Sequence, residues 1–234
     1  MTKLLLSLAF FFSSPVLADL NYLDDLDSQP LISDEMSDAQ LMSEPVDHSP
    51  SEGSDSVLML PEEVFAVEGF DVYQEFPVVI KVSKAANVQQ MWVYQQGVLT
   101  HSFLVSTGRE RWETAKSGRY YFTGTPVGWY QPQRLIRKHY SETWEAYMEY
   151  AVFFVGGVAL HATTPDHYKE LGRRASGGCV RLHKDNAFII FNLVTSEGRG
   201  LVPVVNRHGQ VARDRKGNII RKVGWNTMII VEDK

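Results

Sequence analysis

Short apolar runs separated by turn-forming residues dominate the chain after residue 70. Runs of this kind at intervals of about ten residues predict antiparallel hairpins. Glycine-containing pairs mark the breaks between them, at Gln96–Gly97, Gly156–Gly157 and His208–Gly209. The predicted strands are residues 78–82, 91–94, 98–99, 103–107, 151–155, 158–160, 201–205 and 227–231.

One segment has helical spacing instead. Apolar side chains at positions 187, 188, 190, 191 and 194 would form one face of a helix that Gly198 ends. Asp185 or Asn186 is expected to cap its N-terminus. The pattern therefore predicts a mostly β (α+β) fold of antiparallel hairpins with one main helix.

A long polar and aromatic region, Arg109 to Tyr150, separates the early strands from the later ones. A connection of this length is usually functional or contains unrecognised short strands. Its aromatic residues, which include Trp112, Trp129 and Trp144, could stack on a ligand or simply pack under a loop. We expect a lid in this region.

Residues 1–18 have the pattern of a secretory signal peptide. Lys3 precedes an apolar stretch from Leu4 to Phe12, and Val16-Leu17-Ala18 ends in a small residue, as signal-peptide cleavage sites do. A membrane-spanning helix needs roughly 20 apolar residues, so this stretch is too short to span. We expect an exported protein of the periplasm or cell envelope without an integral membrane segment.

Charge divides the remaining sequence in two. Residues 19–68 contain 14 Asp and Glu and no Lys or Arg, whereas the chain from residue 70 onward has 22 Lys and Arg against 14 Asp and Glu. An acidic segment with few aromatic residues cannot bury enough apolar surface to order itself. We expect a largely disordered linker over 19–68 and one folded domain over 70–234.

Chemistry concentrates around the only cysteine of the chain, Cys179. Exported proteins usually hold their cysteines in disulfide bonds. A single cysteine has no partner within the chain, which indicates a thiol with a chemical function. It follows Gly177-Gly178, where a tight turn could aim the Gly178 and Cys179 amides at a carbonyl oxygen. A thiol also needs a base, and His161, at the end of an apolar run, is the best-placed candidate.

Other interpretations of these residues remain open. A lone cysteine is often a small buried hydrophobe, and a lone histidine is often a satisfied core group. A zinc site could be built from His161, His167, Cys179 and His183, although no typical zinc-ligand spacing is present.

These residues resemble the signature of the L,D-transpeptidase catalytic domain, the YkuD family. That signature is a histidine, fourteen to seventeen residues, then Ser or Thr, a variable residue (commonly His), Gly, Cys, an apolar residue and Arg or Asn. Here fourteen residues separate His161 from Ser176, and Gly177-Gly178-Cys179-Val180-Arg181 follows. Gly177 departs from the common histidine, which excludes a side-chain role there.

The resemblance implies an antiparallel β-sandwich or barrel with the main helix after Cys179, and acyl transfer from peptidoglycan stem peptides. Cys179 would attack the L,D bond of a tetrapeptide, and His161 would shuttle the proton while the carbonyl of Ala162 orients it. Arg181 would brace the site or bind a carboxylate, and Ser176 would hydrogen-bond within the loop. No metal or organic cofactor is needed.

Three functions remain open on this resemblance. A transpeptidase would form 3→3 cross-links or attach an amine or a wall-anchored protein. A carboxypeptidase or amidase would instead hydrolyse wall peptides on the same fold, and a non-catalytic module would only bind the wall. We expect a monomer with no nucleic-acid partner.

Overall fold

The computed structural model describes residues 64–66, 69–87 and 89–233. All of them belong to the unit Glu35–Lys234. The predicted signal peptide and residues 19–63, 67 and 68 of the predicted linker lie outside the described residues. No helix among the described residues is long and apolar enough to cross a membrane.

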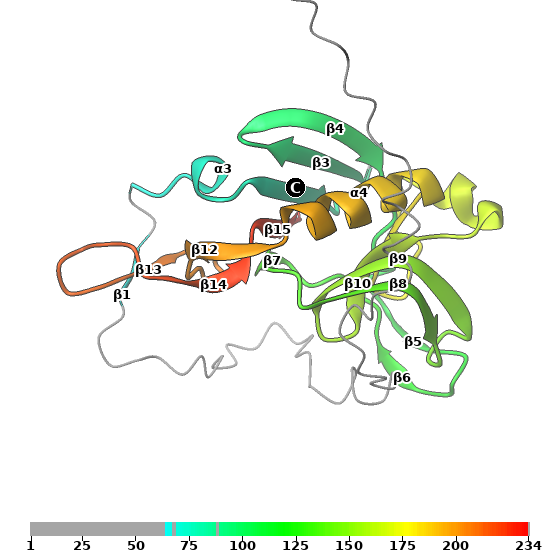
Figure 1. Cartoon of the computed structure of the whole chain (residues 1–234). Helices are drawn as coiled ribbons and strands as arrows, with labels where there is room; N and C mark the ends of the chain where they lie inside the picture. The colour runs from blue at the N-terminus through cyan, green and yellow to red at the C-terminus, as the bar shows by residue number, and fades with distance from the viewer. Residues whose placement is uncertain (1–63, 67–68, 88, 234) are drawn as a thin grey trace, which may run out of the picture. The chain divides into compact units, whose positions relative to one another are not determined.

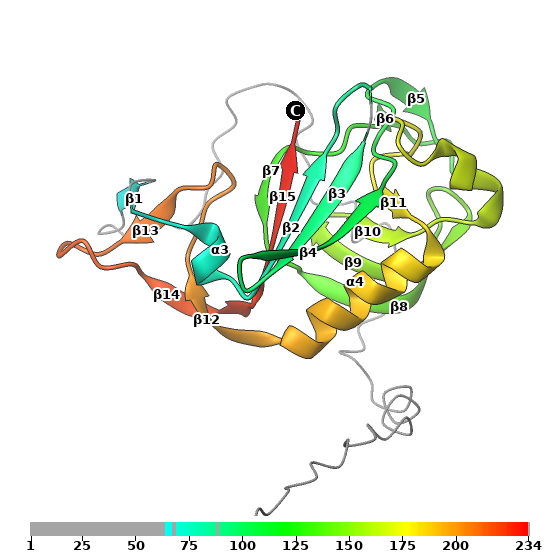
Figure 2. The same cartoon turned by 90° about the horizontal axis from the view of Figure 1, so that it is seen from above.

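A five-stranded sheet combines early strands of the described chain with its final strand. Its order is β4-β3-β2-β15-β7. Figure 1 shows β3 and β4 next to each other, and Figure 2 shows all five strands side by side. The final strand β15 lies inside the sheet, because it pairs in parallel with β2 and antiparallel with β7. The bounds are β2 (Val78–Ser83), β3 (Gln90–Gln95), β4 (Val98–Leu104), β7 (Gly128–Tyr130) and β15 (Thr227–Glu232).

A second sheet of four strands carries the candidate site. Its order is β11-β10-β9-β8, and β10 pairs antiparallel with β9 but parallel with β11. The parallel pair is possible because residues 163–179, with the short helix η1 (Pro165–Glu170), return the chain between the two strands. The bounds are β8 (Arg134–Ser141), β9 (Ala146–Val155), β10 (Val158–Ala162) and β11 (Val180–Leu182).

The main helix, α4 (Lys184–Glu197), packs on β9 and β10. Its buried residues Ile190 and Phe191 share a core with Leu160 of β10 and Ile80 of β2, so one core lies between both sheets and the helix. The helix and its end at Gly198 confirm the prediction. The predicted cap was wrong: His183 is the N-cap, and its ring nitrogen accepts the Asp185 N–H.

Three two-stranded ribbons and a short helix complete the described part. One ribbon pairs β1 with β13, so residues 64–66 form a strand within the range of the predicted, largely disordered linker. Strand pairing with β13 supplies the backbone partners that this short segment lacks alone. The bounds are β1 (Val64–Ala66), β13 (Val211–Arg213), β12 (Arg199–Pro203), β14 (Arg221–Trp225), β5 (Trp112–Thr114), β6 (Tyr120–Phe122) and α3 (Val72–Glu75).

The structure confirms a mostly β fold and corrects three details of it. The sheets are open and do not close into a barrel, and the β2–β15 and β10–β11 pairs are parallel. The predicted lid over 109–150 is largely sheet, because β7, β8 and the start of β9 belong to the two main sheets. Of the strands in this region, only β5 and β6, which form a hairpin, lie outside the two main sheets.

Candidate active site

The parallel pairing of β10 with β11 places His161 and Cys179 on one face of the sheet. Leu160 is opposite Val180, and His161 is opposite Arg181. Side chains two residues apart along a strand share a face, so Cys179, immediately before β11, projects on the same side as Arg181 and His161. Cys179 also packs against the small apolar cluster that contains Ala159, the residue two positions before His161.

His161 is buried in a single tautomer. It is 7% exposed, and its Nδ1 lies 2.7 Å from the carbonyl oxygen of Ala162. Because a carbonyl only accepts, Nδ1 carries the proton and donates, and Nε2 of the neutral ring keeps a lone pair. Burial lowers the pKa of His161 to about 4, the Ala162 bond opposes this, and the charge of Arg181 lowers it further. The ring is therefore a neutral base at pH 7.

This buried histidine predicts a loss of stability on acidification. Its pKa lies below the ordinary value of 6.5, so the unfolded chain binds the proton more tightly. The stabilisation is complete above about pH 6.5 and decreases as the pH falls towards 4, by on the order of 3 kcal/mol. Urea unfolding at pH 7 and pH 4.5 should show that His161→Gln loses less stability than wild type over this range.

The matched control is His208→Gln, which changes an exposed turn residue. It should retain the wild-type pH dependence. Equal losses for wild type and His161→Gln would contradict the assignment of a buried neutral imidazole.

The loop from Ser176 to Cys179 is fixed by hydrogen bonds inside it. The Ser176 hydroxyl donates to the carbonyl of Cys179 and accepts the Gly178 N–H at 3.0 Å. Gly178 has φ +129°, a conformation that only glycine adopts at low cost. The Gly178 amide thus points to Ser176, not to an incoming carbonyl as the sequence suggested.

Two hydroxyl groups outside the loop bind its carbonyls. The hydroxyl of Tyr121, on β6, donates to Gly177 O at 2.8 Å, and that of Thr125 donates to Gly178 O at 2.6 Å. Burial raises the pKa of Tyr121 well above its ordinary value, and the neighbouring Cys179 raises it further. The phenol therefore stays protonated and remains a donor.

Arg181 braces the loops around the cysteine. Its guanidinium lies 3.4 Å from Glu170 Oε2 and 3.4 Å from the carbonyl of Ala175. Burial lowers its pKa, and Cys179 and Glu170 oppose this shift, which places Arg181 in the electrostatic environment of the thiol. Cys179 itself is half-buried, with Sγ 3.7 Å from the carbonyl of Gly157.

Trp144 forms a wall against Gly177. It lies in the turn between β8 and β9, and its indole N–H donates to the hydroxyl of Tyr121 at 2.7 Å. A Cβ added to Gly177 would lie 2.4 Å from three atoms of the indole ring. The indole ring of Trp144 thus occupies the space that a side chain at position 177 would need. Sequence reasoning noticed Trp144 but could not place it, and it missed Tyr121 and Thr125.

The contact predicts that Gly177→Ala destabilises the protein. The new methyl group must displace the Trp144 ring and strain its bond to Tyr121, at a cost of about 1–3 kcal/mol, typical of overpacking. Chemical denaturation of Gly177→Ala, measured alone and together with Trp144→Leu, tests this. The second substitution should make the first nearly neutral, and an equal cost in both backgrounds would contradict the contact.

The residues of the alternative zinc site are not assembled. No group of three or more His, Cys, Asp or Glu suitable for a metal ion lies in the part of the chain that the structure describes. His167 lies 3.0 Å from Glu170, and His183 caps α4.

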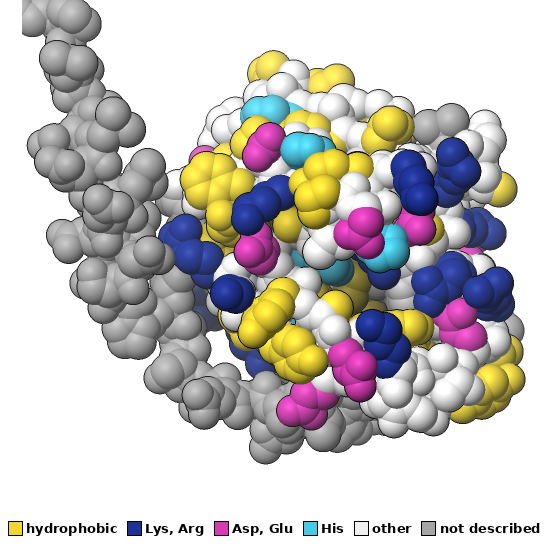
Figure 3. Space-filling view, turned by 90° about the vertical axis from the view of Figure 1, so that its right-hand side faces the viewer, with side chains coloured by type: hydrophobic (Ala, Val, Ile, Leu, Met, Phe, Trp, Pro, Cys, Tyr) yellow, Lys and Arg dark blue, Asp and Glu magenta, His cyan; other side chains and the backbone are white. Residues whose placement is uncertain are grey.

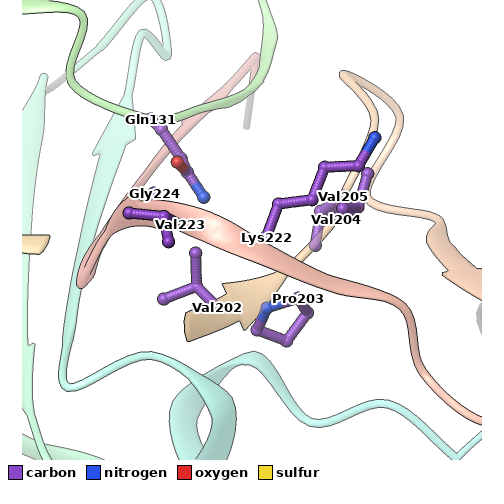
Figure 4. A pocket seen from close by; sticks show the side chains of 8 residues that line it. All are labelled: Gln131, Val202, Pro203, Val204, Val205, Lys222, Val223 and Gly224. Atoms are coloured by element: carbon purple, nitrogen blue, oxygen red, sulfur yellow. The ribbon is translucent and has the colours of Figure 1, made fainter. Parts of the chain in front are cut away.

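The surface has two further features, a face with mixed charges and a cavity away from the cysteine loop. The side of the molecule with the β5–β6 and β8–β9 hairpins has Lys, Arg, Asp, Glu and His interspersed with apolar side chains, without segregation by charge (Figure 3). A cavity of about 210 Å³ lies elsewhere, lined by Gln131, residues 202–205 at and after the end of β12, and residues 222–224 of β14 (Figure 4). No residue of the cysteine loop lines that cavity.

Comparison with solved structures gives similarities of low identity. An L,D-transpeptidase from Xylanimonas cellulosilytica DSM 15894 is 20% identical with a TM-score of 0.46, over 68% of this chain and 61% of that chain. An L,D-transpeptidase from Mycobacterium smegmatis is 16% identical with a TM-score of 0.45, over 67% and 59%. One from Mycobacterium tuberculosis H37Rv is 19% identical with a TM-score of 0.43, over 67% and 58%. The chain thus spans roughly three fifths of the length of these structures.

The chain also matches a model of a protein family. No curated protein matches the chain. The family model of the L,D-transpeptidase catalytic domain, YkuD, matches residues 77–214. This range is more than half of the chain and includes both main sheets except β15, together with α4 and the cysteine loop. The chain belongs to the YkuD family of L,D-transpeptidase catalytic domains.

Proposed function

We propose that this chain is an exported peptidoglycan L,D-transpeptidase in which Cys179 is the nucleophile and His161 its base. The main support is that the two residues share one face of the sheet. Burial keeps the imidazole neutral, and the Ala162 carbonyl orients it. Membership of the L,D-transpeptidase family supports the substrate class. The leader-like residues 1–18 support export to the cell envelope.

The proposed reaction has two acyl-transfer steps. Nε2 of His161 takes the Cys179 proton as Sγ attacks the carbonyl between the third and fourth residues of a tetrapeptide stem. The C–N bond then breaks, the terminal D-Ala leaves with the proton from His161, and a thioester remains on Cys179. An amine attacks this thioester and its proton passes to His161. The C–S bond then breaks, and Sγ takes the proton from His161, which restores the thiol.

The oxyanion of each tetrahedral intermediate needs a donor in the loop. Because the Gly178 N–H donates to Ser176, we assign this role to the Cys179 N–H alone. Arg181 stabilises the loops through Glu170 and Ala175 in this proposal, and Ser176 orders the turn.

Mass spectrometry of a purified disaccharide-tetrapeptide incubated with the protein tests the function. A cross-linked dimer that has lost one D-Ala is the expected product. Conversion to the tripeptide alone would indicate a hydrolase on the same fold. An unchanged substrate, with and without an added amine acceptor, would contradict the proposed acyl transfer.

A further inference from the structure

We propose that Thr125 is a positioning residue for acyl transfer, which fixes the direction of the Cys179 N–H. The inference rests on the proposed function, because it concerns the donor to the oxyanion. Thr125 is 1% exposed and lies 53 residues before Gly178 in the sequence. Its side chain contacts no reacting atom in this proposal and acts through the peptide bond that precedes Cys179.

The directions of the two hydrogen bonds at Thr125 are fixed by chemistry. The Gly108 N–H can only donate, and it lies 2.9 Å from Thr125 Oγ1. The Gly178 carbonyl can only accept, and it lies 2.6 Å from the same oxygen. The hydroxyl therefore accepts from Gly108 and donates to Gly178, so its rotation is determined.

One peptide plane connects this bond to the nucleophile. Gly178 O and the Cys179 N–H belong to the same peptide, and in a trans peptide these two groups point in opposite directions. No cis peptide bond occurs among the described residues. A donor that holds Gly178 O on one side of the plane therefore aims the Cys179 N–H to the other side. Gly178 needs such a restraint, because a glycine backbone rotates more freely than any other.

An ion pair between buried Lys84 and half-buried Glu110 holds the main chain of Thr125 in place. Lys84 is 5% exposed, and its Nζ lies 2.7 Å from Glu110 Oε1 and 2.8 Å from the carbonyl of Thr125. The same Glu110 oxygen accepts the Thr125 N–H at 3.3 Å. Both backbone groups of Thr125 are thus bound to charged partners, and charge-assisted bonds of this kind are the stronger ones. The Thr125 hydroxyl is therefore attached to a main chain whose position is restrained.

Loss of the Thr125 hydroxyl should lower the rate of acylation of Cys179 and leave the intrinsic reactivity of its thiol unchanged. Loss of an oxyanion donor costs about 10²–10³-fold in rate, and a donor that is only misdirected should cost less, about 10- to 100-fold. Alkylation of a thiol by iodoacetamide displaces iodide and forms no oxyanion. A residue that only directs the Cys179 N–H should leave that reaction unchanged.

The experiment compares two variants of Thr125 with a matched control. Thr125→Val keeps the shape and removes the hydroxyl, and Thr125→Ser keeps the hydroxyl. The control is Thr123→Val, which removes another buried hydroxyl, one that donates to the carbonyl of Arg111 at 2.9 Å and lies outside the cysteine loop. Each protein is treated with meropenem and, separately, with iodoacetamide, and the rate of each adduct is followed by intact mass.

We expect Thr125→Val to slow the meropenem adduct about 10- to 100-fold, with iodoacetamide alkylation within about twofold of wild type. Thr125→Ser and Thr123→Val should stay within about threefold of wild type in both reactions. Equal slowing of both reactions, slow acylation by Thr125→Ser, or wild-type acylation by Thr125→Val would overturn the inference. A wild-type protein that forms no meropenem adduct would overturn the proposed function, and this inference with it.

Discussion

Cys179→Ala should abolish product formation from the disaccharide-tetrapeptide while the protein stays folded. Removal of a covalent nucleophile normally lowers turnover by several orders of magnitude, about 10⁴-fold or more, because the remaining groups cannot replace the covalent step. The side chain is small and only half-buried at the edge of the Ala159 cluster, so its loss should cost about 1 kcal/mol or less in stability. Product quantification by mass spectrometry and a urea unfolding curve measure the two quantities.

A residual turnover above about one per cent of wild type would remove Cys179 from the role of nucleophile. Arg181→Lys provides the comparison within the same site. It keeps the charge near the thiol but loses the planar guanidinium that reaches both Glu170 and Ala175, so it should impair turnover far less than Cys179→Ala.

Meropenem should form a covalent adduct with Cys179. The strained β-lactam carbonyl presents the electrophile that a thiol activated by His161 attacks. The S–C bond forms, the ring C–N bond breaks, and the ring nitrogen takes the proton, so the whole drug stays on the protein. Intact mass should therefore increase by the mass of one drug molecule. This is an all-or-none effect that needs no acceptor, so it tests acylation apart from transpeptidation.

Cys179→Ser is the sharper control for this reaction. A serine hydroxyl is far less acidic than a thiol, and a neutral His161 alone would have to remove its proton, so no adduct should form. A wild-type protein without adduct after hours at neutral pH would argue against an activated thiol. Equal labelling of Cys179→Ser would place the reaction at another residue.

Local patterns in the sequence were enough for the main elements. The helix over 184–197 follows from apolar spacing and a terminal glycine, and β2, β3, β9, β10 and β15 follow from short apolar runs between turns. Each of these signals lies within a window of about ten residues. The candidate pair His161 and Cys179 stays a prediction, made from a histidine at a strand end, an unpaired thiol on a Gly-Gly turn and the resemblance to the family signature.

The details that failed depend on neighbours distant in sequence. Val64–Ala66 has no local strand signal within the acidic segment, and it is a strand because β13, almost 150 residues later, supplies its hydrogen bonds. The central place of β15 depends on parallel pairing with β2, and no local pattern specifies that partner. His183 caps α4 although Asp185 and Asn186 are the stronger capping types, because β11 and its end at Leu182 set where the helix begins.

The sequence by itself determined which residues could do chemistry, and the tertiary structure decided how they are held. The hydroxyls of Tyr121 and Thr125 bind the carbonyls of Gly177 and Gly178 across more than fifty residues of sequence. A threonine or tyrosine has no distinguishing local pattern when its role is to donate one hydrogen bond to a distant backbone. Such contacts exist only once the β5–β6 hairpin and the segment after it are packed against the cysteine loop, because a hydrogen bond requires two atoms within about 3 Å.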